Sequence, residues 1–87
     1  MPMTGSIVMK ISRAMILETA LRRPFQTNAA VRRMILDGLS EGGPGGVEKI
    51  RAAYQLAHAA DLMAWSYLKD SSASEIVHAA QRVADRY

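Results

Sequence analysis

The 87-residue chain contains no cysteine, which excludes disulfide bonds, zinc–thiolate sites and cysteine nucleophiles. Aromatic residues are also few, with one tryptophan and one phenylalanine, so a surface for stacking single-stranded bases is not indicated. No apolar run approaches the about 18 residues needed to cross a bilayer, and the N-terminus lacks the regions of a secretory signal. These absences favour a cytoplasmic protein that does not enter a membrane.

Motifs that carry chemistry are missing as well. The sequence has no glycine-rich nucleotide-binding motif, no serine in a nucleophile elbow and no metal-ligating H-E-x-x-H pattern. We therefore expect a non-enzymatic protein with no catalytic residues, no metal and no cofactor.

The residues that are present indicate one folded domain over residues 1–87. Hydrophobic residues make up 49% of the chain and charged residues 22%, which is typical of a globular protein. Periodicity predicts an all-α fold, a small bundle of about four helices at residues 6–23, 27–39, 47–70 and 75–87. Residues 6–12 also alternate with a period of two, so a short initial strand is the alternative for that segment.

Local signals set the expected boundaries of these helices. Pro24 is expected to stop the first helix, and Asn28 is a suitable N-cap for the second. The Gly-Gly-Pro-Gly-Gly run at residues 42–46 predicts a flexible hinge or wide turn between two helical halves. Ser72 and Glu75 have the spacing of a capping box for the last helix.

The predicted third helix is unusual because residues 56–68 are polar only at His58, Asp61 and Ser66. A surface helix normally has one broad polar face, so this Ala-rich helix is expected to lie at the centre of the fold or in an interface. Small residues along it would let a neighbouring helix approach closely, either the chain's own first helix or a second copy. The candidate interface residues are Ala53, Ala57, Ala60, Asp61, Leu62, Ala64 and Trp65.

Asp61 also lies three residues after His58. Such a pair can act as a general base with its orienting carboxylate, or as two metal ligands. The other interpretation is structural: a buried carboxylate needs a hydrogen bond, here from Tyr54, Trp65, His58 or an arginine. We expect the structural role.

The net charge of +3 is concentrated in the first 40 residues. Arg22, Arg23, Arg32 and Arg33 flank the predicted junction between the first two helices and form the candidate contact for an anion or a nucleic acid. The alternative is a solvated turn whose arginines pair with Glu18, with Asp37 or with acids of the C-terminal half.

The first functional hypothesis is an accessory regulator or inhibitor that binds a protein partner, acting as a homodimer. It rests on more apolar surface than so short a chain is expected to bury. The alternative hypothesis is a nucleic-acid-binding regulator, of the DNA-binding repressor type, that uses the arginine cluster.

Overall fold

A computed structural model describes residues 12–58 and 61–87 of the chain, except for the side chain of His58. The described part is all-helical and contains five helices: α2 (Arg13–Thr27), α3 (Ala29–Glu41), α4 (Gly43–His58), α5 (Leu62–Asp70) and α6 (Ala73–Arg86). The all-α prediction is confirmed, while the number of helices is one higher than expected. The expected strand or helix at residues 6–11 lies outside the described residues, as do Ala59 and Ala60.

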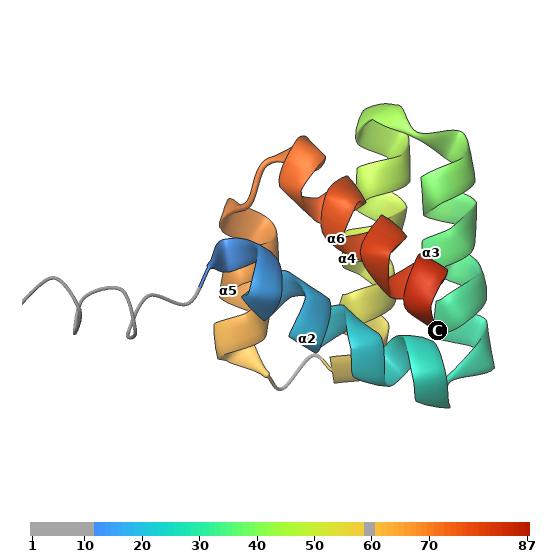
Figure 1. Ribbon diagram of the computed structural model, residues 1–87, viewed down its shortest axis with the longest axis horizontal. Helices are drawn as coiled ribbons and strands as arrows, with labels where there is room; N and C mark the ends of the chain where they lie inside the picture. The colour runs from blue at the N-terminus through green and yellow to red at the C-terminus, as the bar shows by residue number, and fades with distance from the viewer. Residues whose placement is uncertain (1–11, 59–60) are drawn as a thin grey trace, which may run out of the picture.

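The helices form two packed groups. α3 and α4 are joined as a hairpin and lie side by side, while α2 and α6 pack against each other across it (Figure 1). α5 lies at the opposite side from α3 and contacts α2 and α4. Within the described residues, each helix is too short or too polar to cross a membrane.

The core follows the helical periodicity of each element. Leu17, Leu21 and Phe25 recur every four residues on α2, and Ile76, Ala80 and Val83 occupy one face of α6. The complete buried apolar set is Leu17, Leu21, Phe25, Val31, Ile35, Val47, Ile50, Ala53, Tyr54, Leu68, Ile76, Ala79, Ala80 and Val83. Every helix therefore contributes to one hydrophobic core.

The two predicted helix N-caps, which depend on hydrogen bonds between residues close in the chain, are both present. The side chain of Asn28 accepts a hydrogen bond from the amide of Val31 (3.1 Å) at the start of α3. Ser72 and Glu75 form the reciprocal capping box at the start of α6. The amide of Ser72, which donates to the Glu75 carboxylate, lowers the pKa of that carboxyl.

The expectation that Pro24 stops the first helix was wrong. α2 continues through it to Thr27, and both Pro24 and Phe25 are buried. The guanidinium of Arg32 donates to the carbonyl oxygens of Phe25 (2.8 Å) and Gln26 (3.1 Å). Burial of the last turn and hydrogen bonds to its free carbonyls offset the missing amide of proline.

The glycine run is a turn only at its beginning, so the expected hinge at residues 42–46 is mostly helix. Gly42 and Gly43 have positive φ angles of 69° and 62°, which favour glycine, and the next three residues belong to the first turn of α4. A Cβ atom on Gly46 would overlap the backbone carbonyl of Gly38, and one on Gly38 would lie 2.6 Å from the carbonyl oxygen of Gly46. The two glycines therefore let the backbones of α3 and α4 touch.

The predicted helix at residues 47–70 is two helices. α4 ends at His58 and α5 begins at Leu62, with Asp61 as its N-cap. The Asp61 carboxylate accepts a hydrogen bond from the amide of Ala64 (3.2 Å), which competes with a continuous helix. The Ala-rich strip is consequently divided, with Ala53 and Ala57 on α4 and Ala64 on α5.

Replacing Gly46 with alanine tests the contact between α3 and α4. We expect Gly46→Ala to lower the free energy of unfolding by about 1–3 kcal/mol, because the added methyl group meets the backbone of Gly38. The matched control is Gly45→Ala, whose methyl group would meet the flexible end of the Glu41 side chain. That variant should be neutral or slightly stabilised, since alanine has the higher helix propensity. Urea denaturation followed by circular dichroism measures both, and equal effects would contradict the backbone contact.

Candidate partner-binding groove

A groove of about 880 Å³ runs between α2 and α5, and we call it the α2–α5 groove. Tyr54 of α4 contributes to its lining, and Met15 and Met63 lie on its two sides with 59% and 74% of their surfaces exposed. Its apolar lining comes from Met15, Ile16, Ala20, Met63 and Ala64, and its polar lining from Thr19, Arg22, Arg23, Gln26, Thr27, Tyr54, Asp61 and Tyr67. The groove thus has a mixed lining, with apolar side chains from both helices and two arginines along α2.

Asp61 lies at the α5 side of the groove and its carboxylate is engaged on both oxygens. One oxygen accepts from the Ala64 amide, and the other accepts from the hydroxyl of Tyr54 (3.3 Å). Burial of Tyr54, together with the charge and the hydrogen bond of Asp61, raises the pKa of the phenol to about 12. The expected hydrogen bond from Tyr54 to Asp61 is present, but the aspartate is exposed and not buried as its apolar neighbours in the sequence suggested.

The predicted pairing of Asp61 with His58 concerns a side chain outside the described part of the structure, so it stays a prediction. Among the described side chains, no three histidine, aspartate or glutamate residues lie close enough together to hold a metal ion.

The candidate interface residues divide into buried and exposed groups. Ala53 is fully buried in the core and has no surface to offer a partner. Ala57, Ala64 and Trp65 are partly buried, and the ammonium group of Lys69 lies 6.0 Å from the centre of the Trp65 ring. Leu62 is 72% exposed, and Ala60 lies outside the described residues.

The four arginines of the predicted cluster are not equivalent. Arg32 is committed to the end of α2 through its two carbonyl hydrogen bonds, and its guanidinium lies 5.8 Å from the centre of the Phe25 ring. Arg22 and Arg23 are exposed and line the α2–α5 groove. Arg33 is exposed on α3 and does not line the groove. None of the expected ion pairs to Glu18 or Asp37 is formed by these four residues within the described part.

Sequence reasoning missed the exposure of Leu56, Met63 and Met15. Leu56 and Met63 belong to the segment 56–68 that was expected at the centre of the fold or in an interface, yet they are 73% and 74% exposed in the chain. The helix break at Asp61 turns α5 away from the direction of α4, so a face continuous in the sequence pattern is discontinuous in space (Figure 1). The sequence signal for this break was Asp61 itself, because aspartate is a favoured N-cap residue.

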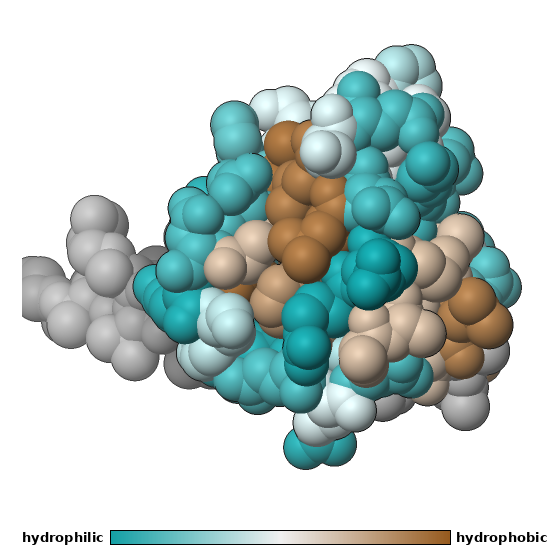
Figure 2. Space-filling view, turned by 90° about the vertical axis from the view of Figure 1, so that its right-hand side faces the viewer, coloured by the Kyte–Doolittle hydropathy of each residue, from teal (hydrophilic) through white to brown (hydrophobic). Residues whose placement is uncertain are grey.

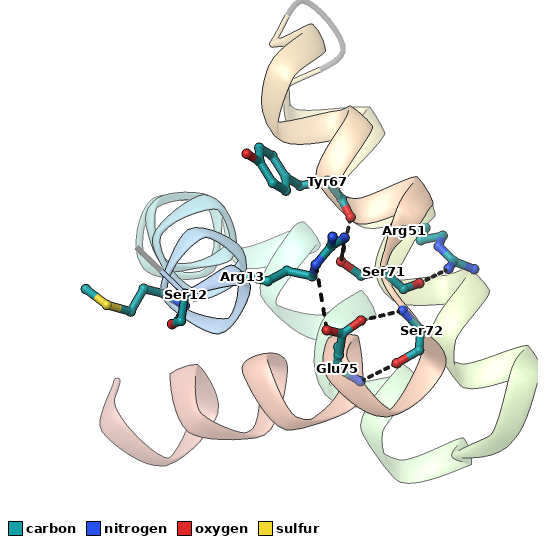
Figure 3. Close-up of polar contacts among 8 residues, drawn as sticks. Ser12, Arg13, Arg51, Tyr67, Ser71, Ser72 and Glu75 are labelled. Atoms are coloured by element: carbon teal, nitrogen blue, oxygen red, sulfur yellow. Dashed lines mark hydrogen bonds and ion pairs between the residues drawn. The ribbon is translucent and has the colours of Figure 1, made fainter. Parts of the chain in front are cut away.

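A second polar cluster joins α2, α4, α5 and α6, and Figure 3 shows that it connects helix ends. Arg51 donates to the carbonyl oxygens of Leu68 and Ser71 (3.1 Å each), which satisfies the end of α5. Arg13 reaches the buried hydroxyl of Ser71 (3.5 Å) and lies 3.7 Å from the carboxylate of Glu75. These side chains are occupied with the fold, so this cluster is not a binding site.

Compared with protein-family models, with curated proteins and with solved structures, the chain matches none of them. The functional argument therefore rests on the chain's own residues.

The capping role of Arg32 predicts a difference from its neighbour. Arg32→Ala should lower the free energy of unfolding by about 1–3 kcal/mol, because two carbonyl groups at the end of α2 lose a charged donor. Arg33→Ala removes an exposed arginine from the same helix and should change stability by no more than about 0.5 kcal/mol. Urea denaturation of the two variants gives the comparison, and equal stabilities would exclude the cap.

The pKa of Tyr54 predicts a loss of stability at high pH. Its phenol titrates at about 12 in the folded chain against an ordinary value of 10.0, so the folded state holds this proton more tightly. The resulting stabilisation is complete below pH 10 and is lost as the pH rises towards 12. Ultraviolet titration should show one tyrosine ionising late, and Tyr54→Phe should remove that late step. A titration in which all three tyrosines ionise near pH 10 would contradict the raised pKa of Tyr54.

Proposed function

We propose that this chain is a non-enzymatic protein-binding module, an accessory regulator or inhibitor that acts by contact and as a homodimer. The observation that carries the proposal is the exposure of large apolar side chains at the α4–α5 junction, where Leu56 and Leu62 are 73% and 72% exposed. Burying a leucine is worth about 1.5–3 kcal/mol, so a partner surface that covers both side chains gains substantially. With no cysteine in the sequence, the proposal includes a cytoplasmic location.

A homodimer is the simplest way to cover this junction. In a two-fold dimer the same patch meets its own copy, so two leucines in each chain become four in one contact. A short chain with a small core benefits from such added burial. The two leucines do not line the α2–α5 groove, although Asp61 and Met63, the neighbours of Leu62 in the chain, do.

The α3 side of the molecule differs from the α4–α5 junction in how far its large apolar side chains are exposed. The α3 side carries a band of hydrophobic residues enclosed by hydrophilic ones (Figure 2). Leu36 is the most exposed large apolar side chain of α3, at 43%, which is well below the junction leucines. It therefore serves as a control for any experiment on the junction.

The alternative function, binding of a nucleic acid, is supported by Arg22, Arg23 and Arg33. Within the described residues these three cations form no hydrogen bond or ion pair, so they are free to meet phosphates. Arg32 contributes little to this alternative because its guanidinium caps α2.

Light scattering tests the homodimer directly. The wild-type chain should have twice its monomer mass of 9.5 kDa at both low and high salt, because the contact is apolar. Leu56→Glu and Leu62→Glu should each shift the mass towards 9.5 kDa, whereas Leu36→Glu should leave the dimer intact. A wild-type chain that stays at the monomer mass at high concentration would overturn the dimer, and equal effects of all three substitutions would exclude the junction as its interface.

A further inference from the structure

The α2–α5 groove has an uncompensated positive charge, and this charge indicates what it binds. Asp61 is the acidic residue among its described lining residues, and both of its oxygens accept hydrogen bonds from the chain itself. Arg22 and Arg23 have no acidic partner in the described part of the molecule. An occupant that brings carboxylates would supply the missing charges.

The chain's own glutamates are already used. Glu18 pairs with Arg82, Glu41 with Lys49, Glu48 with Arg51, and Glu75 with Arg13. Asp37, Asp70 and Asp85 form no ion pair within the described residues, but a second copy has a net charge of +3 and is a poor source of negative charge for Arg22 and Arg23. This favours a different protein as the occupant of the groove.

The apolar lining indicates the shape of the occupant. The stretch of α2 that lines the groove, from Met15 to Thr27, is about 18 Å long, which equals three to four turns of a helix laid beside it. Methionines such as Met15 and Met63 are unbranched and flexible, and they pack well against the apolar face of an incoming helix. Ala20 and Ala64 between them leave room for its side chains.

We infer that the α2–α5 groove binds an amphipathic helix of a partner protein, with its apolar face on Met15 and Met63 and its acidic residues beside Arg22 and Arg23. A nucleic acid fits this site less well. Duplex binding usually requires many phosphate contacts, whereas two arginines are the cations that line this groove among the described residues, and methionines lie on its two sides.

The probe is a synthetic helical peptide of about 14 residues, long enough to span the groove, with leucines on one face and glutamates on both flanks. Its matched control has lysines in place of the glutamates and the same leucines. Fluorescence anisotropy of the labelled peptides measures affinity, and chemical shifts of isotope-labelled methionine methyl groups locate the contact. We expect the acidic peptide to bind about tenfold more tightly at low salt, with shifts at Met15 and Met63.

Charge reversal makes the test specific. The double variant Arg22→Glu/Arg23→Glu should reverse the preference, so that the lysine peptide binds more tightly than the glutamate peptide. The matched control for the single variants Arg22→Glu and Arg23→Glu is Arg33→Glu, which reverses an exposed arginine of α3 that does not line the groove. Arg33→Glu should keep the wild-type preference for the acidic peptide, whereas each of the other two should weaken it. Circular dichroism verifies that each variant folds.

Several outcomes would overturn the inference. These are failure of the acidic peptide to bind, equal binding of both peptides, and an unchanged preference in the double variant. A short DNA duplex that binds more tightly than the acidic peptide, with affinity falling steeply as salt rises, would replace it by the nucleic-acid alternative. The two proposals have separate readouts: the solution mass of the Leu56 and Leu62 variants for the homodimer, and peptide binding with its methionine shifts and charge preference for the groove.

Discussion

The Asp61 carboxylate accepts hydrogen bonds from the Ala64 amide and the Tyr54 hydroxyl, and the α2–α5 side of the molecule depends on these two bonds. The first bond starts α5 as a separate helix, and the second ties that start to the buried Tyr54 in the last part of α4. Without the break, the apolar residues after His58 would continue along the axis of α4. With it, α5 lies beside α2 and leaves the groove between them.

The distribution of ion pairs complements this geometry. Each glutamate of the chain pairs with a basic side chain, and the pair between Glu18 and Arg82 joins α2 to α6. Two further arginines, Arg32 and Arg51, are committed to carbonyl groups at helix ends. Arg22, Arg23 and Arg33 are the described arginines without an acidic or carbonyl partner, and two of these three lie at the groove.

The features that could be predicted from the sequence are those set by neighbours in the chain. The Asn28 cap and the Ser72–Glu75 capping box depend on residues three positions apart, so their spacing is sufficient to place them. The hydrogen bond between Tyr54 and Asp61 was also among the expected alternatives, because a carboxylate in an apolar segment requires a donor.

The features that were missed depend on contacts between helices. Local rules predict that Pro24 ends a helix, but burial of Phe25 and the reach of Arg32 extend α2 by another turn. Glycine runs usually mark loops, but Gly46 belongs to a helix because the backbone of Gly38 lies against it. The groove and its two arginines could not be predicted, because they exist only once the break at Asp61 has placed α5 beside α2.

The way α5 is held bears on the binding site proposed beside it. Leu68 is the fully buried residue of this nine-residue helix, while Ala64, Trp65 and Tyr67 pack against the core only in part. Polar contacts hold both ends, from Tyr54 to Asp61 at the start and from Arg51 to the carbonyls of Leu68 and Ser71 at the end. An element with few buried contacts opens at lower free energy than the core does, and binding surfaces are commonly formed by such elements. α5 forms one side of the groove, and α2, which is anchored in the core by Leu17 and Leu21, holds the arginines of the other side in fixed positions.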